Sequence, residues 1–392
     1  MDKRIGLGRR FLRAAAEYIK GSYKAMWAVI IIISAYSWIL VYSANHRWGS
    51  AGRAIYIQLI VIFLGCIAAI FISLMDYERL GELWWLVGGI CVFMMLWVIF
   101  FGGGARGESS VSENKAWIYI FGISFQSSEL LKIGFLVTFS YHLSRVLKEN
   151  LINNLRQIIL LLGHMVVPVG MIMITKDAGS ALMFTLMAMV ILVSSGINWK
   201  YILAGIAVLL AALPVLWNYM AQYQRDRFRV VYTPNLNDPH DVDLLYQQTQ
   251  GRIAIGSGQL TGQGFLKGQM IQKGLVPECS NDFILTVAGN EFGFLGCLLI
   301  IVLLVALMIF CIRTALQARD DMGRFICVGF FSLLAIQTIF NIGMCLMILP
   351  VIGITLPFFS KGGSSSICLY LGFGLVLSVF SRRNETQMKI LL

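Results

Sequence analysis

Long apolar runs recur from one end of the chain to the other and are separated by shorter polar stretches. A run of about 18 or more apolar residues is long enough to cross a bilayer as an α-helix. The runs predict ten transmembrane helices, over residues 25–44, 55–75, 83–101, 129–147, 157–174, 178–195, 199–216, 283–311, 325–347 and 357–380. We therefore expect an all-α integral membrane protein with one large loop between the seventh and eighth spans.

Composition argues against a soluble enzyme that carries a single anchor. The chain has 392 residues, of which 58% are hydrophobic and 13% charged, and its mean hydropathy is +0.77. A soluble domain carries about 25% charged residues. The eight cysteines show neither disulfide nor metal-ligand spacing, so we interpret them as small apolar packing residues.

The lysines and arginines predict the orientation of the chain. They are concentrated at both ends and in every second short loop, and such basic segments stay in the cytoplasm. We expect a cytoplasmic basic arm over 1–24, a membrane domain over 25–382, a cytoplasmic tail over 383–392 and an extracytoplasmic large loop over 217–282. The net charge of +11 then reflects orientation and contact with anionic membrane lipids. No nucleic-acid surface is expected, because the basic residues are scattered over the membrane edges.

One acid stands where the large loop gives way to the eighth span. Asp282 is followed directly by the apolar residues Phe283 and Ile284. A carboxylate at a membrane boundary is costly unless it faces a cavity or a partner, which makes it a candidate for a functional site. The alternative is a helix N-cap, because Asp is a good cap at the start of an apolar helix.

Other ionisable residues gather at the outer ends of the predicted spans. Arg53 precedes the second span, Asp177 precedes the sixth and Lys361 enters the tenth. Glu129 and Lys132 open the fourth span and are three residues apart, so they share one helix face and are able to pair. Charges gathered at one depth suggest a polar cavity that opens outward. Each residue alone has another interpretation, as an interfacial side chain that reaches to water.

Two further segments are rich in glycine. Residues 255–264 could bring backbone N–H groups close to an anion, and a flexible loop is the alternative. Residues 349–365 place prolines and glycines between apolar spans, where irregular backbone is tolerated only if it is buried in protein or lines a cavity. The alternative for this second segment is a re-entrant structural turn. No nucleophile elbow, HExxH motif or Cys-His cluster is present, so neither covalent catalysis nor zinc chemistry is expected.

Several short motifs occur in a fixed order along nearly the whole chain. They are Trp117, the stretch 125–132, the stretch 177–182, the stretch 227–229, Tyr246 with Gln247, Gly256 with Gly258, Pro277 with Glu278, the stretch 282–284 and the stretch 356–365. Together they resemble the SEDS family, which contains the RodA, FtsW and SpoVE proteins. Any one motif would be weak, but the ordered set is highly specific.

The chain departs from the motifs of that family at a few positions. Two usual prolines are replaced by Ser127 and Lys176, the threonine before the aspartate by Asn281, a glutamate by Asn290 and a tyrosine by Lys361. The acids and the glycines are kept, so we expect activity. The departures leave open whether the chain serves elongation, division or sporulation, and the resemblance favours a RodA-like role.

The resemblance implies a peptidoglycan glycosyltransferase that polymerises lipid II at the outer face of the plasma membrane. Asp282 would be the general base of an inverting transfer, which needs no enzyme nucleophile. Lys132, held by Glu129, would stabilise the leaving diphosphate together with Arg53 and, as a third cation, Lys361. The substrate site implied by the resemblance also contains Trp117, Gln126, Asp177, Tyr246, Gln247, Gly256, Gly258, Pro277, Glu278, Ser360, Gly362, Gly363 and Ser364.

The resemblance further implies a class B penicillin-binding protein as partner, because the chain carries no transpeptidase motif of its own. Other elongation or division proteins, membrane lipids and lipid II itself complete the expected partners. No metal site and no cofactor are evident, and a divalent cation, Mg²⁺ or Mn²⁺, that helps the diphosphate to leave is the alternative. Two other functions stay open: a flippase that moves lipid II across the membrane, and a non-catalytic scaffold for the penicillin-binding protein.

Overall fold

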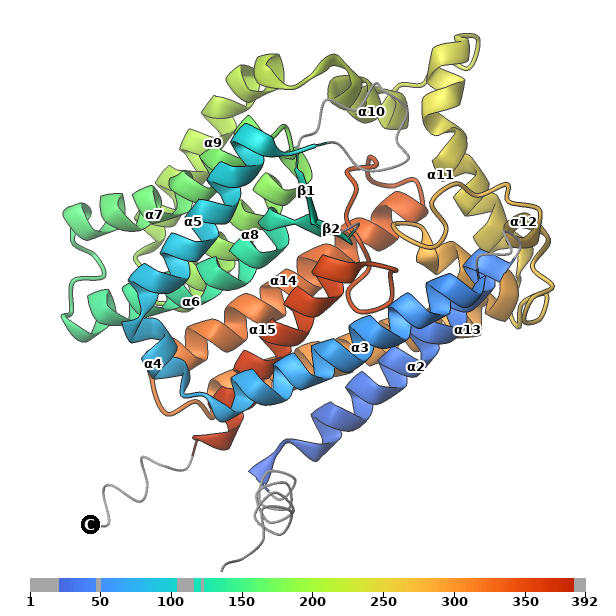
Figure 1. The fold of residues 1–392 in the computed structure, drawn as a ribbon. Helices are drawn as coiled ribbons and strands as arrows, with labels where there is room; N and C mark the ends of the chain where they lie inside the picture. The colour runs from blue at the N-terminus through green and yellow to red at the C-terminus, as the bar shows by residue number, and fades with distance from the viewer. Residues whose placement is uncertain (1–20, 47–50, 104–115, 121–122, 384–392) are drawn as a thin grey trace, which may run out of the picture.

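Helices make up most of the chain in the computed structural model, which describes residues 21–46, 51–103, 116–120 and 123–383 (Figure 1). The predicted basic arm lies almost entirely outside the described residues, and so does the tail beyond residue 383. Within them, ten apolar helices correspond to the ten predicted spans: α2 (Lys24–His46), α3 (Ala51–Leu74), α5 (Trp84–Phe101), α6 (Ser127–Lys148), α7 (Leu155–Ile174), α8 (Ala178–Ser194), α9 (Trp199–Tyr219), α13 (Ile284–Leu316), α14 (Asp321–Cys345) and α15 (Gly363–Ser381). The all-α membrane fold is confirmed.

The ten helices differ in how deeply they are buried. Eight of them are long and apolar enough to cross a membrane, judged by length and composition, while α8 and the first part of α9 are shorter apolar helices. In α6, α14 and α15, 72%, 67% and 78% of the apolar window is buried, against 17% in α5. These three helices therefore form the centre of the bundle, where polar side chains are shielded from lipid.

Two of the predicted spans differ from the helices that form. The sequence predicts a span from residue 357, but α15 begins at Gly363. Phe358 has a left-handed backbone with φ 62°, which a right-handed helix cannot contain. The eighth span is a longer helix than predicted, and non-helical torsion angles at Gly293 (φ 67°, ψ −159°) interrupt it.

The predicted loops contain additional elements. The large loop forms three helices, α10 (Gln222–Tyr232), α11 (Pro239–Ser257) and α12 (Gln269–Gln272). A short antiparallel hairpin of β1 (Trp117–Ile120) and β2 (Ile123–Gln126) leads into α6. Its strands are too short for alternation of polar and apolar residues to reveal them.

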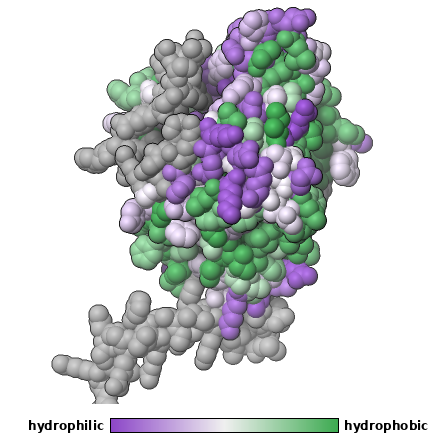
Figure 2. All heavy atoms as spheres, turned by 90° about the vertical axis from the view of Figure 1, so that its right-hand side faces the viewer, coloured by the Kyte–Doolittle hydropathy of each residue, from purple (hydrophilic) through white to green (hydrophobic). Residues whose placement is uncertain are grey.

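The two ends of the bundle differ in what they carry. The start of α2 and the end of α15 lie at the same end, and the hairpin and α10 lie at the opposite end (Figure 1). On the face shown in Figure 2, hydrophobic residues form a broad band low on the molecule, and hydrophilic residues gather above it. This arrangement suits a helical bundle whose polar end lies outside the hydrocarbon of a membrane.

A charged network closes the end of the bundle at which α15 finishes. Arg319, which lies between α13 and α14, pairs with Glu78 at 2.8 Å, with Asp320 at 3.4 Å and with Asp76 at 3.5 Å. Asp76 is the N-cap of the short helix α4 (Tyr77–Glu82), and Asp320 is the N-cap of α14. One guanidinium thus fastens the starts of two helices to each other.

Candidate active site

Asp282 lies at the junction between the large loop and α13 and is half-buried. The N-cap position of α13 is held by Phe283, so the helix begins one residue later than the cap interpretation requires. The carboxylate faces Gly353, since Oδ2 lies 3.8 Å from the point where a Cβ on that glycine would sit. The acid is therefore set against the irregular segment between α14 and α15.

That segment, residues 349–362, is fastened to the stretch before Asp282. The Ser360 hydroxyl donates to the carbonyl of Asn281 at 2.7 Å and accepts from the Leu356 N–H at 2.8 Å. The Lys361 N–H donates to the carbonyl of Ser280 at 2.9 Å. Its irregular backbone is thus satisfied by hydrogen bonds within the protein, as irregular backbone at membrane depth requires.

A second group of predicted residues, Gln126, Asp177 and Ser364, meets at the starts of α6, α8 and α15. Gln126 Nε2 donates to Asp177 Oδ2 at 3.0 Å, and the Gln126 N–H donates to the hydroxyl of Ser364 at 3.2 Å. Asp177 Oδ1 caps α8 by accepting from the Ser180 N–H at 3.0 Å. Gln126, Asp177 and Ser364 therefore lie together, although they are far apart in the sequence. Trp117 is half-buried opposite Gln126 in the hairpin.

The irregular segment joins this second group to Asp282. The carbonyl oxygen of Ile352 lies 2.6 Å from the ideal Cβ position on Gly179, two residues after Asp177. The next residue, Gly353, faces Asp282, and Thr355 Oγ1 lies 3.2 Å from Ser365 Oγ. One stretch of chain thus contacts the starts of α8 and α15 as well as the acid before α13.

Glu129 and Lys132 form a buried ion pair on the central helix α6. Lys132 Nζ lies 2.7 Å from Glu129 Oε1, and the two side chains are only 4% and 9% exposed. Removing both charges from water costs several kcal/mol, which the pairing offsets only in part. The pair lies within the first two turns of α6, the helix that Gln126 of the second group caps.

The predicted residues of the large loop lie nearer the surface. Gln247 Nε2 donates to the carbonyl of Pro277 at 3.5 Å, and Tyr246 on the same helix is exposed. Glu278 is exposed and accepts from Asn281 Nδ2 at 2.6 Å, one residue before Asp282. This part of the loop therefore borders the acid from outside.

The remaining predicted residues lie at the end of α11, around the start of α15 and in the first turn of α3. Gly256 is exposed near the end of α11, while Gly258 is buried against the carbonyl of Gly289, where a side chain would collide. Gly362 and Gly363 are the cap and the first residue of α15. Lys361 Nζ lies 3.5 Å from Asn45 Oδ1. The side chain of Arg53 lies outside the described residues, so only its place in the first turn of α3 is known.

Two buried side-chain amides near the site, those of Asn341 and Gln248, are not among the predicted residues. Asn341 donates to the carbonyls of Asp282 and Ile354, and Gln248 donates to those of Met344 and Leu349. Asn341 is an amide within a predicted membrane span, as is Gln337 one turn before it, and a polar side chain at that depth is the signal that could have drawn attention to it. The partners of both amides are set by the fold and cannot be read from spacing.

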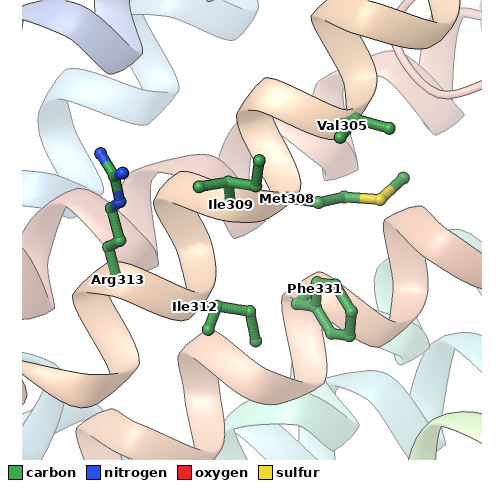
Figure 3. A pocket seen from close by; sticks show the side chains of 6 residues that line it. All are labelled: Val305, Met308, Ile309, Ile312, Arg313 and Phe331. Atoms are coloured by element: carbon green, nitrogen blue, oxygen red, sulfur yellow. The ribbon is translucent and has the colours of Figure 1, made fainter.

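An apolar cavity of 260 Å³ lies between α13 and α14, away from these residues (Figure 3). None of the predicted site residues lines it: the lining consists of Val305, Met308, Ile309, Ile312, Arg313 and Phe331. Among the described residues, no group of three or more His, Cys, Asp or Glu side chains could hold a metal ion. The candidate site is therefore the surroundings of Asp282 and of the irregular segment.

The chain matches one protein family over most of its length and is similar to several named proteins. The FtsW/RodA/SpoVE family of cell cycle proteins matches residues 23–385. The peptidoglycan glycosyltransferase MrdB of Escherichia coli K12 is 30% identical over 90% of this chain and 93% of its own length. A probable peptidoglycan glycosyltransferase FtsW of Geobacter metallireducens is 30% identical over 91% and 94%.

Solved structures agree with these matches. A chain of a peptidoglycan synthase complex, solved to explain the structural coordination of polymerization and crosslinking, superposes with a TM-score of 0.71 at 25% identity, over 92% of this chain and 98% of that one. The rod shape determining protein RodA of Thermus thermophilus superposes with a TM-score of 0.66 at 25% identity, over 92% and 97%.

Proposed function

The chain belongs to the FtsW/RodA/SpoVE family, and from this premise we propose that it is a peptidoglycan glycosyltransferase that polymerises lipid II. Relatives that match nine-tenths of the chain are named for this activity. The observation that carries the proposal is the place of Asp282, a half-buried carboxylate that faces the irregular segment at the end of the large loop. A positioned carboxylate is what a transfer without an enzyme nucleophile needs.

The reaction joins the sugar of one lipid II molecule to that of another. A hydroxyl of the acceptor sugar attacks the anomeric carbon of the donor, the bond from that carbon to the diphosphate breaks, and the configuration inverts. Asp282 takes the proton of the attacking hydroxyl as general base. The lipid diphosphate leaves with the electron pair of the broken bond, so negative charge builds up on it.

Cations next to the leaving group stabilise that charge. Lys132 is assigned this role because it is a buried amine that Glu129 holds in place at 2.7 Å. Arg53 is a second cation, and Lys361, which follows the anchored Ser360, is a third. Gln126, Asp177 and Ser364 line the same region and are assigned to the substrate, as are Trp117 and the exposed residues of the large loop.

The active site lies at the outer face of the plasma membrane. The excess of basic residues at both termini and in alternate loops supports cytoplasmic termini, with the large loop and Asp282 outside. A class B penicillin-binding protein is the expected partner, which would cross-link the new strand. The similarity to a chain of a peptidoglycan synthase complex, in which polymerization and crosslinking are coordinated, supports such a partner.

The proposal is tested by incubating labelled lipid II with the purified protein, with and without its penicillin-binding partner. Long glycan strands are expected from the complex. Transfer of lipid II across vesicle membranes without any strands would establish a flippase instead. Neither strands nor transfer from a folded, partner-bound protein would leave only a scaffold. The same assay with EDTA tests whether Mg²⁺ or Mn²⁺ helps the diphosphate to leave.

A further inference from the structure

A single buried amide holds both sides of the space in front of the Asp282 carboxylate. Asn341 lies in the central helix α14 and is fully buried. Its Nδ2 donates to the backbone carbonyl of Asp282 at 2.7 Å and to that of Ile354 at 2.8 Å. An amide nitrogen carries two hydrogens, so both are used.

The two acceptors belong to the two segments that meet at the site. One is the backbone of the residue that carries the acid. The other is next to Gly353, the residue that the carboxylate faces. Hydrogen bonds made in a low-dielectric interior are strong, and a buried carbonyl left without a donor is costly. The Asn341 amide therefore fixes the distance between the acid and the wall opposite it.

We propose that Asn341 is a positioning residue for the glycosyl transfer. It acts by holding the Asp282 backbone and the irregular segment at a fixed distance from each other. This inference rests on the proposed function, because it gives Asn341 a role only if Asp282 is the base. Asn341 acts through Asp282 and makes no contact with the reacting atoms. Misplacement of a catalytic group by about 1 Å can cost roughly a hundredfold in rate.

The chain offers a matched control in Gln248 on α11, which is equally buried. Its Nε2 also donates to two carbonyls, those of Met344 at 2.9 Å and Leu349 at 2.8 Å. It thus holds the beginning of the same irregular segment by the same chemistry, but it does not touch Asp282. A purely structural role predicts the same behaviour for both amides.

The experiment compares Asn341→Leu with Gln248→Met, since each change removes two donors at nearly constant volume. Thermal stability is measured along with kcat and KM for lipid II in complex with the penicillin-binding protein. Both variants are expected to melt at lower temperature than wild type. Asn341→Leu is expected to lose roughly tenfold to a hundredfold in kcat with KM changed less than about twofold. Gln248→Met is expected to keep kcat within about threefold of wild type.

Asn341→Ser provides a second test if Asn341→Leu does not fold, because its hydroxyl keeps one donor and leaves room for a water. It is expected to retain an intermediate kcat, with KM changed less than about twofold. A kcat loss in the Asn341 variants no larger than in Gln248→Met would overturn the positioning role alone. Absence of strands from the wild-type complex would overturn the proposed function, and the positioning role with it.

Discussion

Lys132 and Glu129 are charged side chains that lie inside the protein, where burying a charge is costly. Their side chains are almost completely inaccessible, and they bond to each other at 2.7 Å. A hydrophobic pair of the same volume would pack on α6 without the cost of desolvation. Retention of two charges is explained if the ammonium is needed opposite a developing negative charge.

Replacing Lys132 by Met is therefore expected to lower kcat/KM for lipid II by roughly a hundredfold. Glu129→Gln should cost less, because it leaves the ammonium in place. Steady-state kinetics of strand formation measure both effects. The matched control is Glu149→Gln at the other end of α6, whose ion pair with Arg145 is more than half exposed. A loss in Glu149→Gln equal to that in Lys132→Met would remove the ammonium from the site.

Glu78 lies in the short helix α4, outside the membrane spans, and its ionisation makes the stability of the protein depend on pH. Its hydrogen bond with Asp320 and its partial burial raise its pKa to about 7. The folded protein then holds a proton on Glu78 between the ordinary pKa of 4.5 and about 7, where the unfolded chain does not. The contribution of Glu78 to stability is thus largest at low pH and falls as pH rises through this range.

The side chain of the Glu78→Gln variant is neutral at every pH, so the variant does not lose stability in this way as pH rises. The Tm of the variant minus that of wild type is expected to increase from pH 4.5 to pH 7 and to level off above it. Thermal unfolding in detergent across this range provides the measurement. Two Tm curves that run parallel would show that Glu78 does not bind the proton.

At the scale of elements, the irregular segment between α14 and α15 organises the site. Its residues contact the start of α8, the start of α15 and the stretch before α13. Gly353 has a left-handed backbone with φ 70° and faces Asp282. A side chain at this position would strain the backbone and enter the space in front of the acid.

Gly353→Ala is expected to reduce strand formation at least tenfold. Gly196→Ala is the control, because Gly196 also has a left-handed backbone, φ 79°, but no atom lies within 4 Å of a Cβ placed there. Both variants should lose about 1–2 kcal/mol of stability from the strained backbone. Only Gly353→Ala should lose the activity, and equal activities of the two variants would contradict the role of the segment.

At the scale of the whole molecule, hydropathy predicts all ten apolar helices but does not predict how the site is assembled. Hydropathy does not reveal the break at Gly293 or the late start of α15, because an average over a whole span smooths out the few polar residues beside them, such as Glu291 and Lys361. Charge spacing predicts the pairing of Glu129 with Lys132, which is confirmed. The meeting of Gln126, Asp177 and Ser364 depends on how α6, α8 and α15 pack, and no local pattern records that packing.

The orientation of the whole molecule is a separate prediction. Alkaline phosphatase inserted after Asp243, an exposed position on α11, is expected to be active, because that enzyme works only after export. The same enzyme fused after Arg383 is expected to be inactive, and a fluorescent protein fused there should glow. The reverse pattern would put Asp282 in the cytoplasm and exclude polymerisation at the outer face.

The central claim is that Asp282 removes the proton during glycosyl transfer, and the most direct test is the initial rate of strand formation by Asp282→Asn in complex with the penicillin-binding protein. The control is Asp243→Asn, the same chemical change at an exposed carboxylate of α11. We expect a folded Asp282→Asn protein that binds its partner and makes no strands, while Asp243→Asn works at the wild-type rate. Wild-type rates from both variants would contradict the account, because the reaction would then proceed without this base.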